Sequence, residues 1–191
     1  MNRLIAAFAL AQAVFIAGVL ALPGKRAASG AGAAADAGDW EPRASLRTSW
    51  THVIVHHSAT PAGSAAQFDR SHRDKGWEGL GYHFVIGNGS LTERGRVEAG
   101  ERWVEQRDGA HAKPEWNGRA IGICLVGDFE KAEPSAEQIA SLEALCAWLC
   151  RRCGIPPENV VGHGETHGNP TLCPGKKLDM EALRRRLKEG R

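Results

Sequence analysis

Residues 120–126 read AIGICLV, an almost entirely apolar run. A strand that alternates apolar and polar side chains is covered on one face, whereas a run without polar positions is typical of a strand covered on both faces. The run therefore predicts the central strand of a sheet that carries helices on both sides.

Three shorter β-branched or aromatic runs predict the neighbouring strands. Residues 53–55 (VIV) lead directly into His56 and His57. Residues 81–86 form a second run, and residues 160–163 form a third that ends in His163. Because side chains alternate across a strand, His56 and His57 are expected to face opposite sides of the sheet, so only one of them can point into a given site.

Helical signals lie between these strands. Residues 64–75 predict a helix that Gly76 ends, and Ser135 with Gln138 forms a capping box that opens a long amphipathic helix. A last apolar stripe follows near the carboxyl terminus at residues 180–187. Strands that alternate with helices predict an α/β fold, a single domain with a central mixed β-sheet flanked by helices.

Length and charge limit the possible functions. The chain has 191 residues, and at roughly 150 residues per domain this length fits one domain with appendages. The formal net charge is only +2, from 24 Lys and Arg against 22 Asp and Glu. No nucleic-acid partner is expected, because such binding draws on a broad basic field.

The amino-terminal part has two segments of unusual composition. Residues 4–22 carry no charge, and residues 27–38 are almost all Ala and Gly. The first segment is typical of an export signal or a membrane anchor, so we expect an exported, periplasmic or cell-envelope protein whose membrane contact is confined to residues 4–22. The expected boundaries are a signal or anchor at 1–25, a linker at 26–48 and a folded domain at 49–191.

Two predicted strand-end histidines and a later cysteine are possible metal ligands. His56, His163 and Cys173 offer two imidazoles and a thiolate, which zinc (Zn2+) binds readily. Three protein ligands leave a fourth tetrahedral position open, as catalysis requires. A buried structural role for His56 and a loop role for His163 are the alternatives.

Three other cysteines follow a different pattern. Cys146, Cys150 and Cys153 have a spacing that in other contexts holds an iron–sulfur cluster. Here they lie at helical spacing within the long amphipathic helix, so they are expected to be small buried hydrophobic residues.

Five segments in order resemble one enzyme family, the zinc-dependent N-acetylmuramoyl-L-alanine amidases, whose fold is shared by bacteriophage lysozyme-type amidases and peptidoglycan recognition proteins. The matching segments are VIVHHSAT at 53–60, HRDKGWEGLGYHFVI at 72–86, GAHAK at 109–113, WNGRAIGICLVGDF at 116–129 and GHGETHGNPTLCPG at 162–175. The resemblance implies a mixed sheet flanked by helices, a zinc cofactor and a peptidoglycan or muropeptide substrate. We also expect the chain to act as a monomer.

The resemblance also implies individual roles. The family's metal ligands fall on His56, His163 and Cys173, and its active-site tyrosine falls on Tyr82. Cys173 lies ten positions after His163, two more than is usual in the family, so His167 is a competing ligand.

Further residues are expected to act in catalysis or in substrate binding. Tyr82 is expected to donate a hydrogen bond to the developing oxyanion or to orient the water, and Thr171 is expected to hydrogen-bond the tetrahedral species. Thr171 occupies a position where some phage members carry lysine. Glu165 is a candidate general base on its chemistry alone. His111 and Asn117 lie in groove-lining segments of the family and are expected to contact substrate.

Two function classes follow from this resemblance. One is a zinc-dependent amidase that cuts the bond between N-acetylmuramic acid and L-alanine, in a host enzyme or an exported phage lysin. The other is a noncatalytic peptidoglycan-binding module on the same fold. Cys173 favours the enzyme, because binding-only members commonly have serine there and a neutral hydroxyl is a poor zinc ligand.

Overall fold

A computed structural model describes residues 40–190, which belong to one compact unit. The segments expected at 1–25 and in most of the linker lie outside the described residues. Among residues 40–190, the structure has no helix that combines the length and the apolar character needed to cross a membrane.

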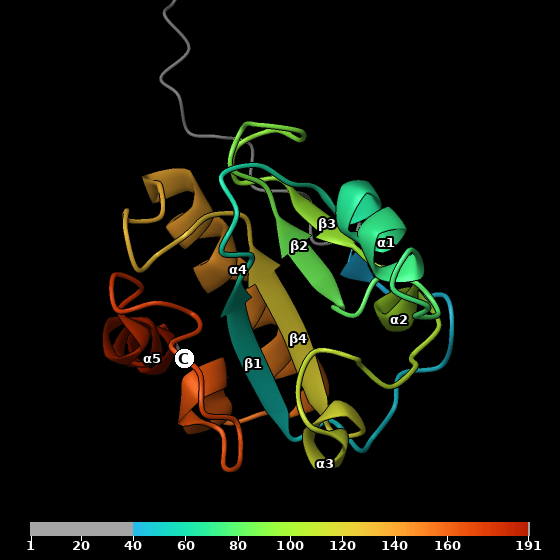
Figure 1. Ribbon diagram of the computed structural model, residues 1–191. Helices are drawn as coiled ribbons and strands as arrows, with labels where there is room; N and C mark the ends of the chain where they lie inside the picture. Colours follow the sequence, from blue (N-terminus) through green and yellow to red (C-terminus); the bar gives the residue numbers. More distant parts are fainter. Residues whose placement is uncertain (1–39, 191) are drawn as a thin grey trace, which may run out of the picture. The chain divides into compact units, whose positions relative to one another are not determined.

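One five-stranded sheet forms the centre of the domain, with the strand order β3-β2-β4-β1-β5 (Figure 1). Strands β1 (His52–His57), β2 (Phe84–Ile86), β4 (Ala120–Leu125) and β5 (Val160–Gly162) pair in parallel, and β3 (Val97–Ala99) runs antiparallel to β2. All six residues of β4 are buried, and β4 occupies the middle of the sheet. The sequence prediction of a central strand in a mixed sheet is confirmed.

Helices cover both faces of the sheet. The longer elements are α1 (Ala65–Arg73), α4 (Ala136–Cys153) and α5 (Met180–Glu189), and the short ones are α2 (Glu101–Val104), α3 (Pro114–Asn117), η2 (Pro157–Asn159) and η3 (His163–Glu165). The capping box of Ser135 and Gln138 opens α4 as predicted, and Gly154 ends it in the left-handed conformation at φ 68°. Cys146 and Cys150 are buried in α4, and Cys153 is partly buried.

The two faces of the sheet carry hydrophobic clusters of very different size. The large cluster lies on the α4 and α5 side and includes Val53 and Val55 of β1. The small cluster lies on the α1 side, where Phe68 packs against Val85 and Cys124. The face under α1 therefore has fewer apolar side chains to fill it and leaves room for polar groups.

Strand alternation separates the two adjacent histidines as predicted. The ring of His57 lies 6.0 Å from the ring of Phe129, a member of the large cluster, and its Nδ1 accepts a hydrogen bond from the Phe129 amide. His56 points to the other face, where its ring lies 5.2 Å from that of Tyr82. Of the two, His56 is therefore the one on the α1 side.

Part of the segment expected to be linker, from residue 40 to residue 48, packs against the folded domain. Trp40 is buried in the large cluster, and its carbonyl accepts a hydrogen bond of 2.6 Å from the indole nitrogen of Trp103. Leu46 packs against the same cluster, and Glu41 forms an ion pair with Arg152. Few apolar residues mark this segment in the sequence, so its packing depends on contacts with distant residues that composition does not reveal.

The buried His83 predicts that the domain loses stability in acid. Burial lowers the pKa of His83 to about 3, below the ordinary value of 6.5. Between these values the unfolded chain binds a proton that the native chain excludes, so the free energy of unfolding falls as pH falls, by up to about 1.4 kcal/mol per pH unit from this group.

Urea unfolding between pH 7 and pH 4 measures this slope. We expect the slope to be shallower in His83→Gln than in the unmodified chain, because a glutamine at this position does not titrate. Equal slopes in the two proteins would show that His83 does not contribute to the acid sensitivity.

Candidate metal centre

Three side chains from separate parts of the chain converge at the carboxyl end of the sheet. The potential ligand atoms of His56, His163 and Cys173 all lie within 4.8 Å of one another. Among residues 40–190 this is the group of His, Cys, Asp and Glu side chains whose geometry can hold a metal ion. The structure therefore brings together the three ligands that the sequence predicts.

The parallel pairing of β1 and β5 explains why the two histidines are neighbours. Val55 pairs with Gly162, so the residues that follow, His56 and His163, lie side by side at the same edge of the sheet. Their ring centroids are 4.4 Å apart. Cys173 reaches this edge from the following loop, where its carbonyl accepts a 2.7 Å hydrogen bond from the Gly164 amide.

The Cys173 thiol lies in a position that suits a metal-bound thiolate. Its Sγ accepts a hydrogen bond of 3.4 Å from the His57 amide and lies 3.7 Å from His56 Nδ1. Burial raises the pKa of Cys173 to about 11, although the hydrogen bond from His57 lowers it in part. A cation in contact with the sulfur supplies the remaining stabilisation that a thiolate needs.

The hydrogen bonding and charge of the two histidines also fit a metal ion. His163 Nε2 is buried and has no hydrogen-bond partner, which is uncommon for a ring nitrogen inside a protein. Burial lowers the pKa of both His56 and His163, so both imidazoles are neutral near pH 7 and keep a lone pair. Two neutral imidazoles and a cysteine sulfur at these distances match the preferences of zinc.

The competing ligand predicted at His167 does not join this group. His167 is exposed, and its carbonyl accepts a hydrogen bond of 3.1 Å from the Trp116 indole. His163 and Cys173 come together although ten positions separate them in the sequence. The longer spacing therefore leaves the predicted ligand His163 in place.

Tyr82 lies beside the three ligands. Its partly buried ring is 5.2 Å from the ring of His56 and packs against the small cluster under α1. The neighbouring Cys124 sulfur, burial and Cys173 all raise the pKa of Tyr82 well above its ordinary value of 10.0. The hydroxyl therefore remains protonated and able to donate a hydrogen bond across the neutral pH range.

Thr171 lies in the same loop as Cys173. Its exposed side chain accepts a hydrogen bond of 3.1 Å from the Cys173 amide, so it helps to fix the turn that presents the sulfur. The hydroxyl proton takes no part in that contact and is available to a second partner.

The structure argues against the general-base role predicted for Glu165. Its carboxylate accepts hydrogen bonds from the Gly162 amide at 2.6 Å and from both terminal nitrogens of Arg184 at 2.9 Å and 3.1 Å. Burial raises the pKa of Glu165, but these hydrogen bonds and the charge of Arg184 lower it further, so the net pKa lies below the ordinary value. A carboxylate of low pKa that is already paired is a weak base.

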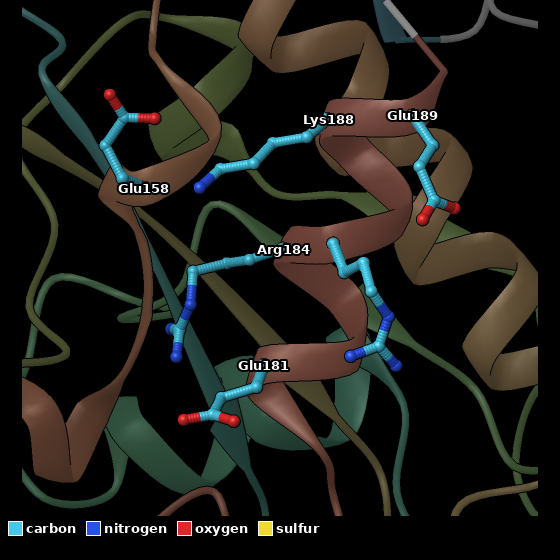
Figure 2. A pocket seen from close by; sticks show the side chains of 6 residues that line it. Glu158, Glu181, Arg184, Lys188 and Glu189 are labelled. Atoms are coloured by element: carbon cyan, nitrogen blue, oxygen red, sulfur yellow. The ribbon is translucent and has the colours of Figure 1, made fainter.

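Arg184 belongs to a different surface of the domain. Figure 2 shows it in a charged pocket of about 680 Å³ between α5 and η2, lined also by Glu158, Glu181 and Lys188. None of the three candidate metal ligands lines this pocket. The ion pair therefore draws Glu165 toward α5 and anchors the η3 turn that carries His163.

We expect Glu165→Gln to retain metal binding and most of its activity. A glutamine keeps an oxygen that can accept from Gly162, and the lost ion pair is partly exposed and is worth at most about 1 kcal/mol. The test compares the turnover of Glu165→Gln and the unmodified chain at equal metal content. A loss of 100-fold or more with full metal occupancy would restore Glu165 as the base.

His111 and Asn117 also occupy positions other than those predicted. The His111 ring is buried, with Nδ1 3.1 Å from His56 Nε2 and Nε2 3.3 Å from the Ala120 carbonyl. The Asn117 amide accepts from the backbone of His111 and Ala112 and donates to the Ala112 carbonyl. Both side chains form hydrogen bonds within the protein, where the sequence predicts substrate contacts.

Comparison with known proteins identifies the family of the chain. The family model described as N-acetylmuramoyl-L-alanine amidase matches residues 46–176. The chain is 34% identical over 175 residues to peptidoglycan recognition protein 1 of Bos taurus, which covers 84% of this chain and 87% of that protein.

Two solved structures of similar fold bear related names. The N-acetylmuramoyl-L-alanine amidase LysC from Clostridium intestinale aligns with a TM-score of 0.63 and 27% identity, over 78% of this chain and 93% of that one. A mutant of Drosophila PGRP-LB in complex with tracheal cytotoxin aligns with a TM-score of 0.56 and 26% identity, over 75% of this chain and 89% of that one. The family predicted from the five sequence segments is confirmed, and the chain belongs to the N-acetylmuramoyl-L-alanine amidase family.

Proposed function

We propose that the chain is a zinc-dependent amidase that hydrolyses the bond between N-acetylmuramic acid and L-alanine in peptidoglycan or its fragments. The observation that carries the proposal is the convergence of His56, His163 and Cys173, whose ligand atoms lie within 4.8 Å of one another. With three protein ligands, a bound zinc ion would keep one coordination position free for water or substrate, which is typical of catalytic rather than structural zinc.

The chain's own groups hold and orient the reacting parts. When bound at the three ligands, zinc supplies a Lewis acid that activates water and polarises the scissile carbonyl. The His57 amide stabilises the negative charge on Cys173 by its hydrogen bond to the sulfur. The register between β1 and β5 sets the separation of the two imidazoles before substrate arrives.

We propose that two hydroxyl groups act on the substrate itself. Tyr82 lies beside His56 with its proton retained, so it can donate to the carbonyl oxygen as negative charge develops there. Thr171 lies in the loop that presents Cys173, and we propose that it donates a hydrogen bond to the same tetrahedral species.

A noncatalytic peptidoglycan-binding module is the second candidate. The relative from Bos taurus is named a recognition protein, and the PGRP-LB neighbour was solved in complex with tracheal cytotoxin. Such a module needs a groove but no open metal position. The retention of the Cys173 sulfur beside two neutral imidazoles supports the enzyme over this alternative.

The cell envelope is the proposed place of action. The uncharged segment 4–22 in the sequence is typical of an export signal or anchor, and peptidoglycan lies outside the cytoplasmic membrane. We propose that the chain acts there as a monomer.

Incubation of the full-length chain with purified peptidoglycan tests the proposed reaction. We expect mass spectrometry to detect stem peptides that begin with a free L-alanine amine, in amounts that fall to background when a chelator is present. The matched control is Cys173→Ser under the same conditions. Peptidoglycan that is retained by the metal-loaded chain without any free peptide would establish the binding module instead.

A further inference from the structure

We infer that His111 is a positioning residue, which fixes the tautomer and orientation of His56 so that Nδ1 of His56 faces the metal position. The effect of His111 on zinc-dependent hydrolysis rests on the proposed function. The tautomer that we infer for His56 follows from the contacts of His111 alone. The sequence predicts a substrate contact for His111. In the structure its buried ring lies against His56, with Nδ1 3.1 Å from His56 Nε2.

Two contacts of His111 determine where the protons lie. His111 Nε2 is 3.3 Å from the Ala120 carbonyl, which has no proton to offer and can only accept. In a neutral imidazole this contact places the proton on Nε2 and leaves Nδ1 as an acceptor. His111 Nδ1 lies 3.1 Å from His56 Nε2, so His56 must be the donor in that pair.

The direction of this hydrogen bond decides which nitrogen of His56 can bind a cation. Donation from His56 Nε2 places its one proton there and leaves the lone pair on Nδ1. His56 Nδ1 is the nitrogen that lies 3.7 Å from the Cys173 sulfur. The lone pair is therefore directed toward the other ligands before any metal binds, which lowers the cost of assembling the site.

Two glycines hold the His111 ring in this position. A Cβ added at Gly122, in the middle of β4, or at Gly109 would collide with the imidazole of His111. The ring therefore occupies a slot that exists because neither backbone carries a side chain. Gly122 interrupts the otherwise apolar strand β4 because the His111 ring approaches the backbone closely at this position.

Another buried histidine packs against the His111 ring. The ring of His83 meets that of His111 edge to face at 5.6 Å, and His83 Nδ1 accepts a hydrogen bond from the Gly122 amide. His111 can therefore neither turn away from His56 nor exchange its contact for one with solvent. A side chain held on three sides in this way is suited to positioning and not to substrate binding.

The test compares two substitutions of His111 in the full-length chain. His111→Leu removes the acceptor and keeps a similar apolar volume, whereas His111→Asn keeps an acceptor near the position of Nδ1. Chelator competition measures the zinc affinity of each protein, and imidazole nitrogen NMR of the metal-free chain reports which nitrogen of His56 carries the proton.

We expect the metal-free unmodified chain to carry the His56 proton on Nε2. We expect His111→Leu to weaken zinc binding roughly 10- to 100-fold and to lose this tautomer preference, and His111→Asn to recover most of both. If His111→Leu does not fold, Gly109→Ala displaces the ring by contact and is expected to weaken zinc binding in the same range.

A His56 proton found on Nδ1 in the unmodified metal-free chain would overturn the inference. Unchanged zinc affinity in a folded His111→Leu protein would also overturn it. Both results are distinct from failure of the proposed function, in which the unmodified chain binds zinc with the expected tautomer but releases no L-alanyl peptide.

Discussion

Replacing Cys173 with serine is expected to remove both metal binding and amidase activity while the fold is retained. A serine hydroxyl is a poor zinc ligand because it does not ionise near neutral pH, and the substitution leaves only the two imidazoles. Loss of a group that hydrogen-bonds a metal ligand typically lowers metal affinity about 10- to 100-fold. Loss of the ligand itself should therefore lower zinc affinity more than about 100-fold. Zinc content after dialysis and turnover of a muramoyl peptide measure the two effects.

His167→Ala is the matched control for this experiment. His167 lies in the same loop but is exposed and outside the cluster, so the variant should bind zinc and cleave substrate like the unmodified chain. Circular dichroism confirms that both variants are folded. If His167→Ala lost its zinc and Cys173→Ser kept it, the ligand set would be wrong.

Replacing Tyr82 with phenylalanine is expected to lower turnover about 100- to 1,000-fold with zinc affinity unchanged. The substitution deletes only the hydroxyl that we propose to stabilise charge on the carbonyl oxygen, and removal of one such donor has an effect of this size. The ring contact with His56 is preserved, so the metal position should be undisturbed. The measurement is kcat at full zinc occupancy, with KM determined alongside it.

Measuring kcat and KM separately distinguishes transition-state stabilisation by Tyr82 from substrate binding. A donor that acts only in the transition state changes kcat, whereas a group that binds the ground state and the transition state equally changes KM alone. A Tyr82→Phe protein with unchanged kcat and a raised KM would show that Tyr82 binds substrate without assisting the reaction.

Local sequence patterns predict the sheet because their physical causes are local. The apolar run at β4 is buried on both faces, and the alternation of side chains in β1 sends His56 and His57 to opposite sides. The proximity of the candidate ligands His56 and His163 follows from the same logic, since both come at the carboxyl ends of parallel strands.

The corrected predictions concern contacts between residues distant in sequence. Arg184 lies 19 positions from Glu165, and their ion pair converts a candidate base into a structural group. His111 lies 55 positions from His56, so no spacing rule relates the two. A glycine within an apolar strand was the available signal, since it indicates that another group approaches the backbone closely.

A zinc titration of the metal-free, full-length chain tests the central claim most directly. Release of L-alanyl peptide from a muramoyl peptide is measured at each zinc-to-chain ratio. We expect activity to be at background without metal, to rise in proportion to bound zinc, and to level off at one ion per chain. Cleavage by the metal-free chain, or no cleavage when the site holds one zinc ion, would contradict the assignment of His56, His163 and Cys173 as a catalytic metal centre.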